Sequence, residues 1–289
     1  MCFRGWLRAL RLRTLPLSIC AVATGGLDAL GRDVIRNPVF LGVVVVAIML
    51  QALSNLANDY GDFVKGVDSE GRVGPPRALQ KGLLTPSALK KGIVALSVAC
   101  LGTGIILLLY TFHDAPGLVA VFTMLGILAI GAAVFYTLGR RPFGYRALGE
   151  VVAFLFFGPV AVCGTYFLLR REVLLANFLH AVGIGFWVAS VLLANNIRDI
   201  SHDATHGKCT LAVALGLAQS QRLLSVLLAL GAAGFVVEGA WPLTLTAFFS
   251  VIPLIVFIWL IPPVRYDIVL RLVVLLIILN TVVKALLLE

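Results

Sequence analysis

The stretch "PVFLGVVVVAIMLQALSNLANDYGDFVKGVD", residues 38–68, sets an uncharged apolar run directly before three aspartates. Pro38–Ala57 carries no charge and matches the ~20 apolar residues that a helix needs to cross a bilayer. Asp59, Asp62 and Asp68 follow where that helix would end. The stretch predicts a membrane-spanning helix with acidic residues at its C-terminal end. It therefore also predicts a cation or cationic group that neutralises these acids.

The remainder of the 289 residues repeats the apolar pattern. Hydrophobic residues make up 60% of the chain and charged residues only 13%, against roughly a quarter in a typical soluble domain. Further apolar runs are Ile93–Phe112, Ala115–Gly139, Val151–Leu169, Val173–Ile197, Leu223–Val237 and Gly239–Val264, with weaker candidates at Leu15–Leu30 and Ile268–Leu288. We expect an all-α polytopic membrane protein with about nine transmembrane helices, forming a single transmembrane domain over residues 1–289.

The basic residues predict the orientation, because short cytoplasmic loops retain Lys and Arg. With the N-terminus inside, the expected cytoplasmic segments hold most of the 23 basic residues; the exceptions are Arg32, Arg36, Arg170, Arg171 and Lys284. Nine spans then put the C-terminus outside. In the last span, we expect Arg271 and Lys284 to snorkel to the two interfaces. The same bias accounts for much of the net charge of +9, so no nucleic-acid partner is expected.

Residues 1–14 are interpreted as an amphipathic segment on the inner membrane surface rather than a signal peptide. Phe3, Trp6 and Leu10 fall on one helical face, and the arginines lie away from it. The five cysteines form no CxxC pair and are interpreted as small packing residues.

An internal repeat places acids and amides twice on the same side of the membrane. "NLAND" begins at Asn55 and "NNIRD" at Asn195, and four predicted spans separate them. Each motif continues with more acid and then a basic, glycine-containing loop. The repeat predicts two four-helix halves plus a ninth helix around a central cavity, with the functional site where the halves meet.

Helical spacing gathers the polar residues of each motif on one face. The first set is Asn55, Asn58, Asp59 and Asp62, and the second is Asn195 or Asn196 with Asp199 and Asp203. Clustered carboxylates repel one another, and Mg²⁺ is commonly held by one or two carboxylates together with phosphate oxygens. The basic residues that can bind a diphosphate are Lys65, Arg72, Arg77, Lys81, Arg198 and Lys208. The pattern predicts metal ions gripping the charged head of a lipid-like substrate whose tail stays in the lipid bilayer.

Other interpretations remain open from the residues alone. Single aspartates at helix ends can be solvated caps, but two matched clusters on one side favour a binding site. A membrane transporter is the alternative from another functional class, although transporter acids usually lie near the bilayer midplane. His202 and His206 flank Asp203 at a zinc-like spacing but are interpreted as loop histidines. Tyr136, Tyr145, Arg146 and Glu150 surround a turn and either contact an aromatic acceptor or anchor the interface.

Four motifs together resemble the UbiA superfamily of intramembrane prenyltransferases. They are "NDYGDFVKGVD" (58–68), "GPPRALQKG" (74–82), "YTLGRRPFGYRALGE" (136–150) and "NNIRDISHDATHGKCTLAVALG" (195–216). The superfamily pattern NDxxDxxxD fits Asn58, Asp59 and Asp62, but Gly66 stands at the third acid position and Asp68 lies two residues later. Asp199 and Asp203 fit the later DxxxD pattern. The departure at Gly66 is similar to the menaquinone branch of the superfamily.

The resemblance implies a reaction and its residues. A polyprenyl diphosphate loses diphosphate with Mg²⁺ assistance, and an aromatic carbon attacks the allylic cation. In the menaquinone branch, the acceptor is 1,4-dihydroxy-2-naphthoate, which also loses CO₂; 4-hydroxybenzoate, homogentisate or a porphyrin-type ring are the rival acceptors. The implied metal ligands are Asp59, Asp62, Asp68, Asp199 and Asp203, and the implied catalytic residues are Asn58, Asp62, Arg77, Asp199 and Asp203. The expected substrate-binding residues are Asn55, Lys65, Arg72, Lys81, Tyr136, Tyr145, Arg146, Asn196, Arg198 and Lys208, with Arg77 or Arg146 facing the carboxylate of a naphthoate.

Overall fold

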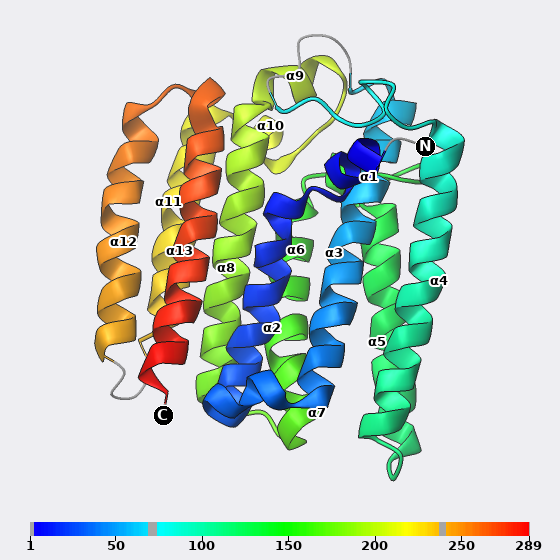
Figure 1. Ribbon diagram of the computed structural model, residues 1–289. Helices are drawn as coiled ribbons and strands as arrows, with labels where there is room; N and C mark the ends of the chain where they lie inside the picture. The colour runs from blue at the N-terminus through cyan, green and yellow to red at the C-terminus, as the bar shows by residue number, and fades with distance from the viewer. Residues whose placement is uncertain (1–2, 69–73, 237–240, 289) are drawn as a thin grey trace.

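The computed structural model describes residues 3–68, 74–236 and 241–288, and its long helices run side by side (Figure 1). They are α2 (Leu15–Leu30), α3 (Pro38–Val64), α4 (Pro86–Thr111), α5 (Pro116–Phe135), α6 (Gly149–Leu155) continued by η4 (Phe156–Cys163) and α7 (Gly164–Arg170), α8 (Leu175–Arg198), α11 (Leu217–Ala233), α12 (Trp241–Leu260) and α13 (Tyr266–Leu287). The shorter helices are α1 (Phe3–Leu10), η1 (Leu12–Thr14), η2 (Gly31–Arg36), η3 (Phe143–Tyr145), α9 (Ile200–Thr205), α10 (Leu211–Leu215) and η5 (Pro263–Arg265). Among the described residues, Arg146 and Cys209 form an isolated β-bridge.

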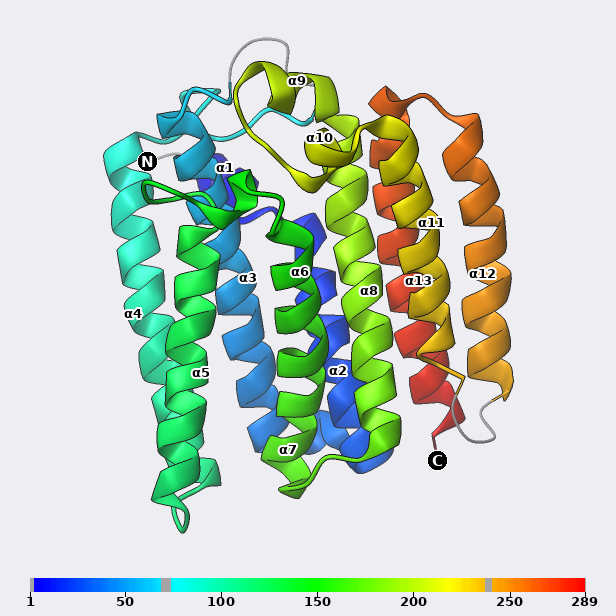
Figure 2. The ribbon, with the colours of Figure 1, turned by 180° about the vertical axis from the view of Figure 1, so that it is seen from behind.

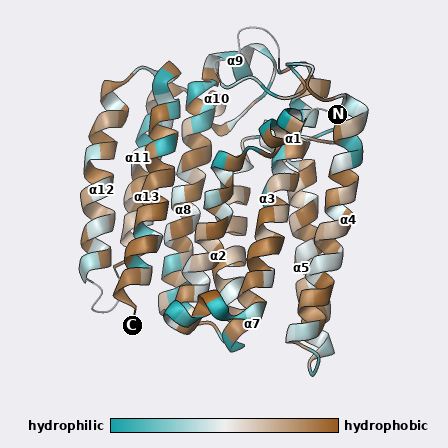
Figure 3. Ribbon diagram, viewed as in Figure 1, coloured by the Kyte–Doolittle hydropathy of each residue, from teal (hydrophilic) through white to brown (hydrophobic). Residues whose placement is uncertain are grey.

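The all-α polytopic fold is confirmed. About nine spans were expected, and eight helical segments of the described chain are long and apolar enough to cross a membrane. The expected span at Leu223–Val237 overlaps α11, an apolar helix of only 17 residues that ends at Ala233; Val237 lies outside the described residues. The weak candidate Leu15–Leu30 is α2, with the same bounds. Hydrophilic residues gather toward the two ends of the bundle and hydrophobic residues fill its middle (Figure 3). This distribution is that of a multi-pass membrane protein.

The two ends of the bundle differ in the elements that cover them. One end, here named the α9 end, carries α1, α9, α10 and the described residues between α3 and α4 (65–68 and 74–85). The opposite end carries η2, the end of α7 and the turn between α4 and α5 (Figures 1 and 2). Of the amphipathic segment expected at residues 1–14, Phe3–Leu10 forms α1 at the α9 end and Leu12–Thr14 forms η1, while residues 1–2 lie outside the described residues.

Local sequence fixes where the spans begin. Asn37 caps α3 because its Oδ1 accepts hydrogen bonds from Val39 N at 2.9 Å and Phe40 N at 3.2 Å. Thr85 caps α4 in the same way, with Oγ1 accepting from Ala88 N at 3.1 Å. Each cap is followed by a proline, which suits the first helical position because it needs no N–H partner there.

The expected span Val151–Leu169 is one membrane crossing with an irregular middle. Its central part, η4, is a π-helix containing Pro159, whose missing N–H breaks the α-helical pattern. At Gly158 an added Cβ would lie 2.5 Å from the carbonyl oxygen of Ala181, so the span and α8 approach backbone to backbone. Glycine at this position therefore permits the packing of η4 on α8.

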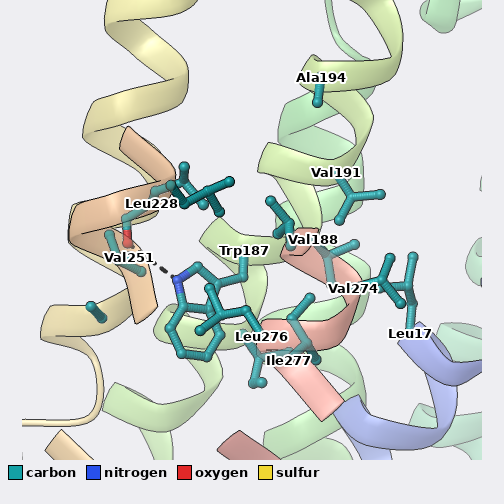
Figure 4. Close-up of a cluster of buried hydrophobic side chains, with 14 of the residues drawn as sticks. Leu17, Trp187, Val188, Val191, Ala194, Leu228, Val251, Val274, Leu276 and Ile277 are labelled. Atoms are coloured by element: carbon teal, nitrogen blue, oxygen red, sulfur yellow. Dashed lines mark hydrogen bonds between the residues drawn. The ribbon is translucent and has the colours of Figure 1, made fainter. Parts of the chain in front are cut away.

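The largest buried core lies around α8 (Figure 4). Trp187 is fully buried, donates from Nε1 to the carbonyl oxygen of Leu228 at 3.2 Å, and stacks on Phe235 with ring centroids 4.9 Å apart. The helices α2, α6, α11 and α13 all pack against α8, whereas α5 packs against α3 and α4. We therefore distinguish a packed body around α8 and a three-helix unit, α3–α5, and α2 packs against both.

A buried ionic cluster near the opposite end corrects one expectation. Lys284 is only 4% exposed and does not snorkel; its Nζ makes an ion pair with Asp28 Oδ1 and lies 2.8 Å from His180 Nδ1. His180 Nδ1 lies 3.1 Å from both Asp28 oxygens, and Asn177 Nδ2 donates to Asp28 Oδ2 at 3.0 Å. The cluster joins α2, α8 and α13, and each of its charges has an internal partner, as an intramembrane charge requires.

Candidate functional site

A cavity of about 690 Å³ lies between the α3–α5 unit and the body around α8. Its polar lining residues include seven from the two sequence motifs and the segments near them: Asn55, Asn58, Asp62, Arg77, Asn195, Asn196 and Lys208. Apolar residues of α2, α3, α4, α5, α6, η4, α7 and α8 line most of its remaining wall. Along α3 the lining runs from Asp62 to Val43, about 28 Å at the helical rise. One cavity therefore joins a charged head region to a long apolar region.

The last turns of α3 present the first motif to this cavity. Asn55, Asn58 and Asp62 share one helical face and line the cavity together. Asn55 Nδ2 donates to the carbonyl oxygen of Leu10 at 2.9 Å and to Thr14 Oγ1 at 3.0 Å, which ties α3 to the N-terminal segment. Of the expected set, these three side chains line the cavity together, whereas Asp59 is not among the lining residues.

Close packing of α3 on the end of α5 sets the position of Tyr136. An added Cβ at Gly61 would lie 2.5 Å from Thr137 Oγ1, and that hydroxyl donates to the carbonyl oxygen of Ala57 at 2.8 Å. Tyr136, next in the chain to Thr137, lines the cavity beside Gly149. The contact through Thr137 was not apparent from the sequence, because a single threonine after an apolar run carries no recognisable signal.

Asp62 lies at the centre of the charged head region. Its Oδ2 accepts from Arg77 Nη2 at 2.6 Å and from Lys208 Nζ at 3.3 Å, while Oδ1 accepts from the Tyr145 hydroxyl at 2.6 Å. Asp62 is 1% exposed. We name Asp62, Arg77, Tyr145 and Lys208 the Asp62 cluster. Charge-assisted hydrogen bonds of this kind are short and strong, so they fix the carboxylate firmly.

Arg77 connects the acids of the first motif. Its Nη1 donates to the carbonyl oxygen of Asn58 at 2.6 Å, and its Nε lies 3.1 Å from Asp68 Oδ1. Burial opposes the charge of Arg77, but the carboxylates of Asp62, Asp68 and Asp59 outweigh it and raise the pKa of the guanidinium. Asp59 itself accepts a hydrogen bond from Ala78 N at 3.3 Å. Arg77 therefore remains charged at the wall of the cavity.

The second motif meets the first through Lys208. Lys208 Nζ lies 3.3 Å from Asp62 Oδ2 and 4.0 Å from Asp203 Oδ1, so one ammonium stands between an acid of each motif. Asp199 is held differently: Arg198 Nη2 donates to its Oδ2 at 2.6 Å and to Asn195 Oδ1 at 2.8 Å. The expectation that the two motifs face one another is thus met at Asp62 and Asp203.

Burial shifts the acid–base behaviour around this contact. Desolvation raises the pKa of Asp203 to about 6, and nearby Lys208 only partly offsets it. Desolvation also lowers the pKa of Lys65, whose Nζ lies 4.3 Å from the centroid of the Tyr145 ring. The pKa of Tyr145 is raised by desolvation and by Asp62, so its hydroxyl stays a hydrogen-bond donor at neutral pH.

The remaining predicted residues fall into three groups. Lys81 and Arg146 are exposed at the α9 end, and Arg146 is not among the cavity-lining residues, although Arg77 is. Arg198 is buried against Asp199 instead of reaching the cavity. Arg72 lies outside the described residues.

One polar contact beside the cavity was not predicted in this form. Asn196 lines the cavity, and its Nδ2 donates to Glu150 Oε1 at 2.8 Å; Glu150 is 4% exposed. The amide is thus held from behind by a buried carboxyl group. The "GYRALGE" motif placed Glu150 near the site, but only the fold pairs it with Asn196.

The histidines of the second motif are not gathered as zinc ligands. His202 Nε2 lies 2.6 Å from the carbonyl oxygen of Val67, and His206 Nδ1 lies 2.8 Å from the carbonyl oxygen of His202. Within the described part of the chain, no three His, Cys, Asp or Glu side chains come close enough together to hold a metal ion. His202 instead links α9 to the segment that follows α3.

The donor set nevertheless fits Mg²⁺ when a substrate supplies further ligands. Mg²⁺ prefers oxygen, and one or two protein carboxylates with phosphate oxygens and water complete its shell. Asp62 and Asp203 provide two carboxylates on either side of Lys208. Asp62 and Asp203 need a nearby positive charge to offset their own. Lys208 supplies it in this structure, and a metal ion could supply it in the same place.

Comparison with known proteins agrees with this architecture. The model of the UbiA prenyltransferase family matches residues 17–267. The 1,4-dihydroxy-2-naphthoate octaprenyltransferase of Haemophilus influenzae is 42% identical over 233 residues, covering 78% of this chain and 74% of the relative. The enzyme of the same name from Escherichia coli is 39% identical, covering 78% of this chain and 73% of the relative.

A solved structure gives the same fold. A UbiA homologue from Archaeoglobus fulgidus, bound to GPP and Mg²⁺, superposes with a TM-score of 0.66 over 96% of this chain and 99% of the homologue, at 14% identity.

Proposed function

The chain belongs to the UbiA prenyltransferase family, and from this premise we propose that it transfers a polyprenyl group from polyprenyl diphosphate to 1,4-dihydroxy-2-naphthoate, releasing diphosphate and CO₂. The observation that carries the proposal is the single cavity that joins the Asp62 cluster to a long apolar region. Such a shape suits an amphiphile with a charged head and a hydrocarbon tail. The names of the relatives at 39–42% identity support the choice of acceptor.

The diphosphate would lie at the Asp62 cluster. Arg77 and Lys208 both line the cavity and offer N–H donors to phosphate oxygens. Asp62 and Asp203 are the proposed Mg²⁺ ligands, with Asp59, Asp68 and Asp199 as the further candidates from the sequence. When bound, Mg²⁺ would neutralise the diphosphate and stabilise the negative charge that develops on it as it leaves.

The cavity wall protects the reaction after diphosphate leaves. The C–O bond of the donor breaks with its electron pair on the diphosphate, and the allylic cation then bonds to a ring carbon of the acceptor. The apolar wall excludes the water that would otherwise capture the cation. Tyr136 also lines the cavity and would supply an aromatic ring near the cation.

The acceptor carboxylate needs a cationic partner, and Arg77 is favoured over Arg146. Arg77 lines the cavity, whereas Arg146 is exposed outside it. A guanidinium at the wall would hold the carboxylate of the naphthoate until it leaves as CO₂.

We further place the protein in the cell (inner) membrane with the N-terminus and the α9 end cytoplasmic and the C-terminus outside. The excess of Lys and Arg in the segments at the α9 end supports this orientation. Both the charged diphosphate and the polar acceptor would then enter from the cytoplasm.

The test is a prenyl-transfer assay in proteoliposomes with labelled polyprenyl diphosphate, Mg²⁺ and a panel of acceptors. We expect product with 1,4-dihydroxy-2-naphthoate and release of CO₂. Asp62→Asn and Asp203→Asn should each abolish turnover, while Asp33→Asn, an exposed acid at the opposite end, should not. Product with 4-hydroxybenzoate and none with the naphthoate would move the protein to another branch. Near-normal activity of either site variant at limiting Mg²⁺ would contradict the two-motif site.

A further inference from the structure

The end of the cavity farthest from the Asp62 cluster is built from two glycines and an aromatic floor. We name this part the distal chamber and define it by the lining residues Val43, Gly104, Leu107, Phe122, Gly126 and Phe167. Gly126 lies ten residues before Tyr136 on α5, about 15 Å along the helix, and Phe122 lies about 21 Å from it. The chamber is therefore reached only by a ligand that extends well beyond the charged head region.

The two glycines leave the chamber open. An added Cβ at Gly104 or at Gly126 would meet no other atom within 4 Å, although both residues line the cavity. This differs from Gly61 and Gly158, where the missing side chain makes room for a neighbouring helix. Glycine costs roughly 1 kcal/mol relative to alanine within a helix. At Gly104 and Gly126 the absent side chain leaves open space in the cavity, where a prenyl tail can lie, and no neighbouring helix fills that space.

Aromatic side chains, here named the aromatic floor, line the far part of the chamber; Val173, half exposed in the loop after α7, also lines the cavity. The Phe122 and Phe167 rings stack with centroids 5.5 Å apart, and the fully buried Phe112 lies beneath them, 5.5 Å from Phe122 and 6.3 Å from Phe167. The guanidinium of Arg171 covers Phe112 at 5.5 Å and pairs with Asp114 at 2.6 Å. The floor thus joins α5 to α7 and ends in an ion pair at the surface.

We infer that these positions set the length of the prenyl chain: Gly104 and Gly126 admit the far isoprene units into the distal chamber, and Phe122 with Phe167 ends it. The inference rests on the proposed function, because it assigns the occupant of the cavity to the donor's tail. A long donor would fill the chamber, and the burial of its far isoprene units would add to its binding free energy. A short donor would end above it and would not sense its residues.

Large side chains at the two glycines are the direct probe. In a helix, side chains lean toward the N-terminus. Because α4 and α5 run in opposite directions, a Phe at position 104 leans toward the Asp62 cluster and a Phe at position 126 leans toward the floor. The longest donor that Gly104→Phe accepts should therefore be shorter than the longest donor that Gly126→Phe accepts. The matched control is Gly102→Phe, since Gly102 has the same open surroundings on α4 but does not line the cavity.

The experiment offers each protein an equimolar mixture of geranyl, geranylgeranyl and octaprenyl diphosphate with Mg²⁺ and acceptor, and measures product lengths by mass spectrometry. Gly126→Phe and Gly104→Phe should each lower the ratio of octaprenyl to geranyl product about tenfold or more. In an apolar pocket, one methylene group alone changes selectivity by about tenfold or more. Gly102→Phe should keep the wild-type ratio, and Phe122→Ala should shift the ratio toward the longest donor.

Two outcomes would overturn the inference while the proposed function stands. One is an unchanged length profile in both glycine variants, which would mean that the tail leaves the cavity sideways into the bilayer. The other is an equal loss of all three products in variants that remain folded by thermal melting. Failure of the wild type to transfer any of the three groups would instead overturn the proposed function.

Discussion

Tyr145 donates a hydrogen bond from its hydroxyl to the Oδ1 oxygen of the Asp62 carboxylate at 2.6 Å. Arg77 and Lys208 donate to Oδ2 of the same carboxylate. Tyr145→Phe should leave Asp62 ionised but less fixed, and raise the Mg²⁺ concentration for half-maximal activity by about tenfold, the equivalent of one charge-assisted hydrogen bond. A Mg²⁺ titration of initial rates measures this. Tyr110→Phe, at an exposed site on α4, is the control, and an unchanged Mg²⁺ midpoint in Tyr145→Phe would refute the assignment.

Asp203 is kept at a cost in stability. Its pKa is about 6, raised by burial from an ordinary value of 3.8. An acid whose pKa is raised on folding destabilises the folded state when it is ionised. That loss begins as the pH rises above the ordinary value and is complete above pH 6, where it amounts to roughly 3 kcal/mol.

Asp203→Asn should therefore melt at a higher temperature than the wild type at pH 7.5 in the absence of Mg²⁺ and substrate, even though it is inactive. At pH 4.5, where the wild-type acid is largely protonated, the difference should shrink. Thermal melting in detergent at both pH values measures this. An equal or larger difference at pH 4.5 would show that Asp203 is not the titrating group.

At the scale of helices, apolar runs predicted the elements well, and side-chain partners less well. Leu15–Leu30 was a weak candidate by charge, because Asp28 lies near its end, yet it forms α2 with those bounds. Its 16 residues are fewer than the ~20 that cross a bilayer, but they lie within the candidate span Phe3–Arg36. The pairing of Asp28 with Lys284 depends on which helices become neighbours, and no local pattern encodes that. The π-helix at Pro159 escaped prediction for a similar reason: the proline signals a break, but packing on α8 selects its form.

The buried ionic cluster gives a prediction for α2, α8 and α13. Lys284→Met removes the cation and leaves Asp28 buried, which should cost about 3–5 kcal/mol, as breaking one side of a buried pair does. The double variant Asp28→Asn/Lys284→Met removes both charges and should recover most of that loss. Thermal melting of the two variants in detergent measures the coupling. Additive losses would mean that the ion pair does not act as a unit. Arg271→Met, an exposed residue of the same helix, is the control.

At the scale of the whole molecule, the sequence motifs predicted which residues would converge but not how they are neutralised. The repeat brought Asp62 and Asp203 toward one another because four spans between them return the chain to the same end. That Lys208 stands between the two acids, and that Arg77 contacts Asp62, Asp68 and Asn58 together, follows from the loops that cover the α9 end. Loop conformations depend on long-range contacts such as His202 with Val67, so helical spacing could not supply them.

The orientation in the membrane gives a prediction for the two ends of the bundle. In a variant without native cysteines, Lys81→Cys lies exposed at the α9 end and His113→Cys lies 79% exposed, by its side chain, at the opposite end. A membrane-impermeant thiol reagent added to intact cells should label position 113 and not position 81. Labelling after cell lysis should reach both. The reverse pattern would invert the topology and place the diphosphate site outside.

The pairing of Asp28 with Lys284 also bears on how the chain is made. The acid lies in the first long helix and its partner in the last, so at ~5–20 residues per second the ribosome needs roughly 10–50 s to supply the lysine after the aspartate. During that interval Asp28, which lies near the end of α2, has no lysine partner, and an intramembrane carboxylate without a partner is unfavourable. We therefore expect α2 to stay beside the translocon, or to carry a protonated Asp28, until α13 is made. α2 would then move into the lipid together with its lysine partner.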